Sequence, residues 1–239
     1  GCLLKDWEKQ EVSTQKYVSI TIPLKLTGGI SIRKYSTRPE EADFEQLTIQ
    51  QIFENGEEKQ SVPVIPGTSW AGAVRSRTKK LLKDLNCSEE KAERRINGWV
   101  GYVDVKAGKD KKTAGQSMIV IGESILKNAV PLVTTRNKIN RFSAATVDGA
   151  LYTEKAYFGG ETQLEIKIRK DKEGCYQLLA AMLSFVARDI ANGYLSVGGQ
   201  TAIGRGIFEG NGDVTSTISE QDMELYKKQL AAMIQKGVC

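Results

Sequence analysis

The chain has no histidine, and this absence excludes several classes of enzyme. Histidine is the commonest general base, proton shuttle and metal ligand, so Ser-His-Asp triads, Cys-His dyads and HExxH metalloproteases are ruled out. The four cysteines, Cys2, Cys87, Cys175 and Cys239, lie far apart and include no CxxC pair. Their spacing suggests neither a zinc site nor a dense disulfide framework, and it favours a reducing, cytoplasmic setting.

Long hydrophobic runs are lacking as well. No segment approaches the roughly 20 apolar residues that span a bilayer, and the N-terminal stretch lacks the apolar core of a secretory signal. We therefore expect a cytoplasmic protein without a membrane partner. What is present is 40% hydrophobic residues in a chain of 239, which is enough to bury a sizeable core. We assign residues 1–239 to a single domain.

Charge is distributed unevenly along the chain. The net charge of +5 permits a polyanionic partner without requiring one. Residues 38–60 carry a local charge of −5, residues 75–115 carry +6, and residues 127–141 hold four basic residues and no acid. A basic segment alone is more often a solvated face than a binding surface, so its neighbours in the fold decide its meaning.

The pattern of apolar residues in the first half predicts strands followed by a basic helix. Alternation over residues 17–27 predicts a half-buried strand, and residues 47–53 and 61–66 predict a hairpin around the turn Asn55-Gly56. Thr68 and Ser69 follow as N-cap residues, and the helical period then runs over residues 70–85. Its predicted apolar face is made by Ala71, Val74, Thr78, Leu81 and Leu85, with Leu82 beside it.

The second half adds strands and two helices. Strands are expected over residues 118–126, 152–158 and 163–169, and a largely buried helix over 176–190. A glycine cluster then leads into a predicted edge strand that starts at Ile207. Residues 88–116 read as a flexible insertion and residues 219–236 as a C-terminal helix with a capping box at Ser219. This order resembles ferredoxin-like βαβ units with insertions.

The glycine cluster is not a typical nucleotide-binding loop. Rossmann and Walker loops follow a strand and open a helix, whereas here the order is helix, glycines, strand. Arg205-Gly206 also stands where a Walker loop has its phosphate-binding lysine and hydroxyl. This loop is the only feature of the sequence that supports a small-molecule enzyme. The other readings are a turn that needs glycine geometry, or a loop that an RNA backbone approaches closely while Arg205 binds a phosphate.

Two segments together resemble a known family. They are PVIPGTSWAGAVRSR, residues 63–77, and SVGGQTAIGRG, residues 196–206. They resemble the RAMP superfamily of CRISPR-associated RNA-binding proteins, and more narrowly the small backbone subunits of type III CRISPR effector complexes. The matching positions are Ile65, Pro66, Gly67, Thr68, Ser69, Gly72 and Arg75 in the first segment and Gly198, Gly199, Gly204 and Gly206 in the second.

The resemblance implies a fold, partners and RNA contacts. The fold would be α+β, a modified ferredoxin-like (RRM-like) domain with inserted loops and hairpins. The partners would be guide RNA (crRNA), complementary target RNA, other CRISPR effector subunits and copies of the chain itself in a filament that serves antiviral defence. The glycine loop would act through its main-chain amides. The RNA-binding residues implied are Ser69, Arg75, Gly198, Gly199, Gly204, Arg205 and Gly206, with Arg136, Lys138 and Arg141 on an inserted hairpin.

The resemblance also implies an aspartate, in the loop after the first strand, that supports divalent-metal-dependent cleavage of target RNA. Asp43 is the best-placed candidate, with Glu40, Glu41 and Glu45 competing for the role. It would act as an endoribonuclease residue with Mg²⁺ or another divalent metal once RNA is bound. The alternatives are a non-catalytic RNA-binding scaffold and a CRISPR precursor-processing endoribonuclease. The latter class commonly uses a histidine, which this chain lacks.

Overall fold

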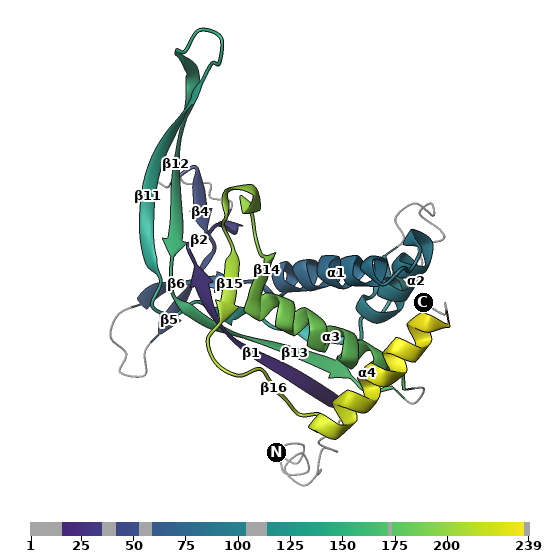
Figure 1. The fold of residues 1–239 in the computed structure, drawn as a ribbon. Helices are drawn as coiled ribbons and strands as arrows, with labels where there is room; N and C mark the ends of the chain where they lie inside the picture. The colour runs from purple at the N-terminus through teal and green to yellow at the C-terminus, as the bar shows by residue number, and fades with distance from the viewer. Residues whose placement is uncertain (1–15, 35–41, 53–58, 104–113, 172–173, 237–239) are drawn as a thin grey trace.

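The structure, a computed structural model, describes residues 16–34, 42–52, 59–103, 114–171 and 174–236. It confirms the α+β class: helices pack on one face of an antiparallel sheet, and a long β-hairpin extends away from this body (Figure 1). The helices are α1 (Gly67–Asp84), α2 (Glu89–Val100), α3 (Cys175–Ala191) and α4 (Glu220–Gln235), with a short 3-10 helix, η1 (Thr201–Ile203).

The central sheet has six strands in the order β14-β15-β1-β13-β9, with β16 beside β1. Its middle strand is the one that the alternating pattern predicted, and Ile20, Ile22 and Leu24 are buried along it. Residues between them point to the opposite face because successive side chains of a strand alternate. The strands are β1 (Tyr17–Thr27), β9 (Ile119–Ile121), β13 (Glu161–Arg169), β14 (Asn192–Ser196), β15 (Ile207–Gly210) and β16 (Thr215–Ser216).

The remaining strands form three smaller sheets. The sheet that contains the protruding hairpin has the order β11-β12-β4-β3, with β2 also paired to β12. Its strands are β2 (Gly29–Ile30), β3 (Arg33–Lys34), β4 (Phe44–Gln46), β11 (Val130–Ile139) and β12 (Thr146–Phe158). The other two sheets contain β5 (Thr48–Ile52), β6 (Lys59–Ile65) and β10 (Ser124–Ile125), and β7 (Tyr102–Val103) with β8 (Ala114–Gly115).

Helix α3 covers the central sheet and is the predicted buried helix. It contacts β1, β13, β14 and β15, and most of its apolar residues are fully buried. Helix α4 packs on α3 through Tyr226 and Leu230, and the hydrogen bond between the hydroxyls of Tyr226 and Tyr176 raises the pKa of Tyr226 to about 12. The Ser219 hydroxyl accepts a hydrogen bond from the Asp222 amide at 3.1 Å, so the capping pattern was interpreted correctly.

Helix α1 begins earlier than predicted, and its buried face is the predicted one in part, since it includes Val74, Thr78 and Leu82. It starts at Gly67 after Pro66, without a side-chain cap, so Thr68 and Ser69 lie inside the helix rather than at its N-cap. The buried residues, spaced four apart, are Trp70, Val74, Thr78 and Leu82. The predicted face omitted Trp70, which packs on the ring of Phe208 at 5.2 Å between centroids, and included Leu85, which is exposed.

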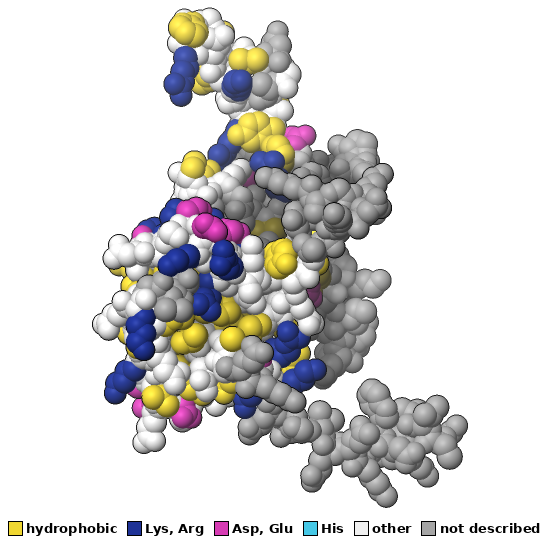
Figure 2. All heavy atoms as spheres, turned by 90° about the vertical axis from the view of Figure 1, so that its right-hand side faces the viewer, with side chains coloured by type: hydrophobic (Ala, Val, Ile, Leu, Met, Phe, Trp, Pro, Cys, Tyr) yellow, Lys and Arg dark blue, Asp and Glu magenta, His cyan; other side chains and the backbone are white. Residues whose placement is uncertain are grey.

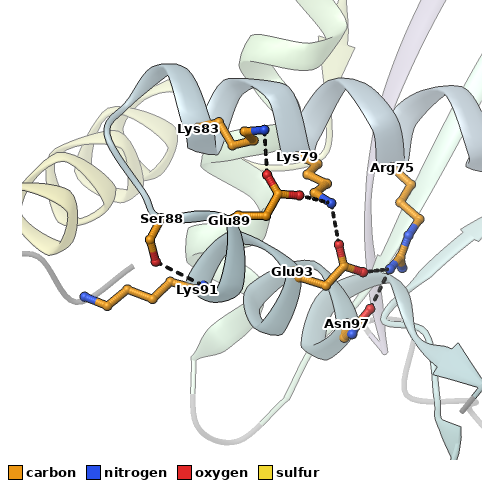
Figure 3. Close-up of polar contacts among 8 residues, drawn as sticks. All are labelled: Arg75, Lys79, Lys83, Ser88, Glu89, Lys91, Glu93 and Asn97. Atoms are coloured by element: carbon orange, nitrogen blue, oxygen red, sulfur yellow. Dashed lines mark hydrogen bonds and ion pairs between the residues drawn. The ribbon is translucent and has the colours of Figure 1, made fainter.

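The expected flexible insertion at residues 88–116 contains a packed helix instead of loop over its first half. Ser88 caps α2, and Ala92, Ile96 and Trp99 bury its inner face. Helices α1 and α2 are joined by a ladder of ion pairs, shown in Figure 3. Hydrogen bonds from Lys79 and Lys83 lower the pKa of Glu89 to about 2. These ion pairs join residues six or more positions apart along the chain, and together with the buried apolar face of α2 they order this charged segment.

Three further details differ from the sequence-based predictions. Strand β15 is internal, since it pairs with both β14 and β1, and β14 is the edge strand. Residues 118–126 form two short strands in different sheets, and Cys87 takes part in a disulfide bond that the cysteine spacing did not indicate. The turn at Asn55-Gly56 lies outside the described residues. None of the helices in the described ranges has the length and apolarity needed to cross a membrane.

Candidate nucleic-acid interface

The two sequence motifs meet in space. The glycine loop, residues 198–206, connects β14 to β15 and lies against the first turns of α1. Between them is an open hollow, which we call the motif hollow. Its lining is made of Ile32 and of small residues from both motifs, namely Thr68, Ser69, Gly72, Ala73, Ser196, Gly198 and Gly199. The structure therefore brings Ser69, Gly198 and Gly199 together, as the resemblance implied.

Close packing requires glycine at two positions of this loop, Gly198 and Gly206. A side chain at Gly198 would put its Cβ 2.7 Å from the Ile32 Cγ1 atom, and the backbone there has φ of +93°. The expected contact between the loop amides and an RNA phosphate is wrong for three residues. The N–H groups of Gly199, Gly204 and Gly206 already donate to the carbonyls of Ser31, Thr201 and Gly29. These bonds hold the loop in place, so the three amides are not presented to a phosphate.

Arg205 does not present its charge to solvent. Its side chain is 6% exposed, and its guanidinium donates to the Glu154 Oε1 atom at 2.6 Å. Glu154 is fully buried in β12 and also accepts from the Ser31 hydroxyl at 3.3 Å. The expected phosphate contact from Arg205 is therefore not formed here, because this guanidinium neutralises a buried carboxylate. Its pairing ties the glycine loop to the protruding hairpin.

Arg75 is also engaged within the protein. Its guanidinium donates to the Gly101 carbonyl at 2.8 Å, to Glu93 at 3.0 Å and to Asn97. These partners all belong to α2 or its C-cap, as Figure 3 shows for Glu93 and Asn97. The helix periodicity placed Arg75 correctly on α1, but it points toward α2 and away from the motif hollow. Its role is to join the two helices.

The expected inserted hairpin is present as β11 and β12, and it carries the charges that remain available. Lys138 and Arg141 are exposed, and Arg136 is partly exposed with its guanidinium 4.0 Å from the Glu154 Oε2 atom. Exposed apolar side chains alternate with them, including Leu132, Ile139, Phe142 and Leu151. Figure 2 shows lysine, arginine and hydrophobic side chains together on this arm. Such a surface offers both phosphate contacts and apolar contacts to bases.

Asp43 lies at the root of the hairpin. It is exposed, and its Oδ2 atom accepts a hydrogen bond from the Thr153 amide at 2.7 Å. Its competitor Glu45 is held by Lys155 at 2.9 Å, and Glu40 and Glu41 lie outside the described residues. No cluster of three acids, cysteines or histidines occurs among the described residues. An ion such as Mg²⁺ fits a single carboxylate when phosphate oxygens and water complete its ligands.

Some residues near this interface were not singled out from the sequence. Arg33 lies over the ring of Phe44 with its guanidinium carbon 3.9 Å from the ring centroid, and Phe44 meets Tyr152 edge to face. Glu154 was likewise missed. No local signal marked Glu154, because β12 contains other polar and charged residues such as Thr153 and Lys155 and the partner of Glu154 is 51 residues away in the sequence.

Comparisons with known proteins agree with this geometry. A sequence model of the RAMP superfamily matches residues 52–209, more than half of the chain. A chain of the type III-B Cmr-beta complex in its apo state matches with a TM-score of 0.52 and 14% identity, over 83% of this chain and 97% of that one. A chain of Cmr-beta bound to cognate target RNA matches with a TM-score of 0.51 and 12% identity, over 89% and 65%. No curated protein matches in sequence.

Proposed function

This chain belongs to the RAMP superfamily, and on that basis we propose that it is an RNA-binding backbone subunit of a type III CRISPR effector complex. In this proposal it holds guide RNA, meets complementary target RNA, and assembles with other effector subunits and with copies of itself in antiviral defence. Structural likeness to two Cmr-beta chains supports the assignment. The observation that carries it is the protruding hairpin, which presents exposed basic and apolar side chains from a stretch, residues 127–141, that contains no acidic residue.

The hairpin charges are expected to set the salt dependence of RNA binding. A double variant, Lys138→Gln with Arg141→Gln, removes two exposed charges without touching the Glu154 pair. If each contacts a phosphate, the slope of log K against log salt falls by roughly 0.7 per contact, about 1.4 in total, and affinity at low salt drops roughly tenfold. Fluorescence anisotropy with single-stranded RNA across a salt series measures both quantities.

The matched control removes the same charge elsewhere. Lys228 and Lys236 are exposed on or just after α4, so Lys228→Gln with Lys236→Gln changes net charge equally. The proposal requires the hairpin variant to lose more affinity than this control. Equal losses of affinity would mean that RNA binding depends only on the net charge of the chain. Absence of RNA binding by the unaltered chain would contradict the proposed function altogether.

We also propose that Asp43 supports cleavage of the target RNA. Its exposed carboxylate is oriented by the Thr153 amide at the hairpin root, beside the surface proposed to bind RNA. The 2′-oxygen would attack the adjacent phosphorus as the bond to the 5′-oxygen breaks. Asp43 would orient the 2′-hydroxyl for this attack and supply a carboxylate ligand for a divalent metal such as Mg²⁺. That metal supplies stabilisation of the developing negative charge when it is bound.

Cleavage is tested in the assembled complex with guide RNA, labelled complementary RNA and Mg²⁺. Asp43→Ala is expected to abolish periodic cleavage while leaving target binding within a few fold of the unaltered complex. Glu45→Gln serves as the neighbouring control, because Glu45 is already paired with Lys155. Unchanged cleavage by the Asp43→Ala complex would show that Asp43 is not the catalytic residue, and absence of cleavage by the unaltered complex would support a non-catalytic scaffold.

A further inference from the structure

An exposed aromatic ring lies beside a fixed guanidinium at the far end of the motif hollow. Tyr194 on β14 is 66% exposed, and the guanidinium carbon of Arg77 on α1 lies 6.0 Å from its ring centroid. We propose that Tyr194 and Arg77 form a stacking site for one base of single-stranded RNA. This inference rests on the proposed RNA-binding function, to which it adds a recognition site made of residues outside the matching positions of the two motifs.

The position of Tyr194 and Arg77 follows from the alternation of side chains along β14 and from the helical repeat of α1. Along β14, Leu195 is buried, so Tyr194 and Ser196 face the opposite side, and Ser196 lines the motif hollow. Along α1, Ala73 lines the same hollow and Arg77 lies one turn further on the same side. The pair therefore continues the hollow beyond Ser196 and Ala73, away from the glycine loop. A strand of RNA that lies in the hollow would reach the ring next.

The guanidinium is held before any ligand arrives. Its Nε atom donates to the Asp189 Oδ2 atom of α3 at 2.7 Å, and both side chains are mostly buried. This ion pair fixes the plane of Arg77 relative to the edge of β14. A residue fixed in this way loses little further conformational freedom when it contacts a ligand. Tyr194, by contrast, leaves most of its surface in solvent, so it contributes little to the stability of the fold.

This combination suits a nucleobase better than a protein side chain. Bases of single-stranded RNA stack on exposed aromatic rings and on guanidinium planes, with little dependence on sequence. A neighbouring cation also attracts both the ring and the phosphate that follows the base. Stacking of one base on an aromatic side chain is expected to change affinity roughly 5- to 100-fold. The site thus adds affinity without reading sequence, as a guide-holding surface requires.

The test measures stacking as well as affinity. Single-stranded RNA that contains 2-aminopurine is bound to the full chain, because fluorescence of this base is quenched when it stacks. Tyr194→Ala is expected to weaken binding at least fivefold and to reduce the quenching at saturating protein, whereas Tyr194→Phe keeps both. Leu225→Ala on α4 is the control for loss of an exposed apolar side chain, since Leu225 is also about half exposed. Melting temperatures check that each variant is folded.

Each outcome has a distinct meaning. If the hairpin variant Lys138→Gln with Arg141→Gln loses affinity but Tyr194→Ala binds and quenches normally, the stacking site is wrong and the proposed function stands. If Tyr194→Ala alters only self-association in size-exclusion chromatography, the ring belongs to a contact between copies and the inference is overturned. If the unaltered chain binds no RNA, both the inference and the proposed function fail.

Discussion

Replacing Glu154 by glutamine is expected to lower the free energy of unfolding by about 3–5 kcal/mol. The substitution keeps the size of the side chain but removes the charge that neutralises Arg205, whose guanidinium is 2.6 Å away and 6% exposed. A buried guanidinium without a counter-charge bears its full desolvation cost. For a chain of this size the expected fall in Tm is roughly 2–4 °C per kcal/mol, so thermal or denaturant unfolding detects it easily.

Two further variants separate the ion pair from general effects. Glu154→Gln combined with Arg205→Met should be less destabilised than the sum of the single variants, because the unpaired charge is then absent. Glu165→Gln on β13 removes an acid that is largely exposed, and its effect should stay within about 0.5 kcal/mol. A Glu154→Gln variant as stable as Glu165→Gln would show that the buried pair contributes nothing.

Replacing Gly206 by alanine should disrupt the glycine loop. The backbone there has φ of +72°, and an added Cβ would lie 1.9 Å from the Val197 carbonyl oxygen. The left-handed conformation alone costs a residue with a Cβ roughly 1–3 kcal/mol. The collision is with backbone that pairs back to the loop, since the Val197 amide donates to the Gly206 carbonyl at 2.8 Å. We expect a loss of stability larger than the conformational cost, measured by denaturant unfolding.

Gly204 provides the matched control within the same loop. Its φ is +81°, yet a Cβ added there meets no atom within 4 Å. Gly204→Ala should therefore show the conformational cost alone, and the difference between the two alanine variants measures the collision at Gly206. If the two variants unfold at the same denaturant concentration, close packing against Val197 is not the reason for glycine at position 206.

Local pattern was enough to predict the central strands and the buried helix. The alternation over residues 17–27 and 163–169 gives β1 and β13, because a strand with one buried face has period two in its sequence. The two glycine-containing motifs also came together as expected, with Ser69 and Gly198 lining one hollow. Each of these features depends on residues that are close together in the sequence, either in an alternating strand pattern or in a short motif.

The functions of single charged residues could not be predicted in the same way. Arg75 and Arg205 stand in motifs that resemble RNA-binding segments, but their partners, Glu93, Asn97 and Glu154, are 18 to 51 residues away. Which acid a guanidinium meets depends on tertiary packing, which periodicity does not encode. The bonds from the Gly199 and Gly206 amides to the Ser31 and Gly29 carbonyls likewise join residues far apart in the sequence. The start of α1 was misplaced because Pro66, rather than a polar side chain, precedes its first turn.

The buried pair between Glu154 and Arg205 has a mechanical consequence for the hairpin. The root of the arm is held at Glu154, because tilting it would separate two charges that have almost no access to water. Beyond Glu154, the two-stranded ribbon runs from Thr134 to Ile139 on β11, which is roughly 17 Å at about 3.3 Å per residue. A register shift between Asn137 and Ile139 interrupts the ladder along this span. Bending is therefore concentrated in the outer part, which carries Lys138, Arg141 and Phe142, while its root stays aligned with the glycine loop.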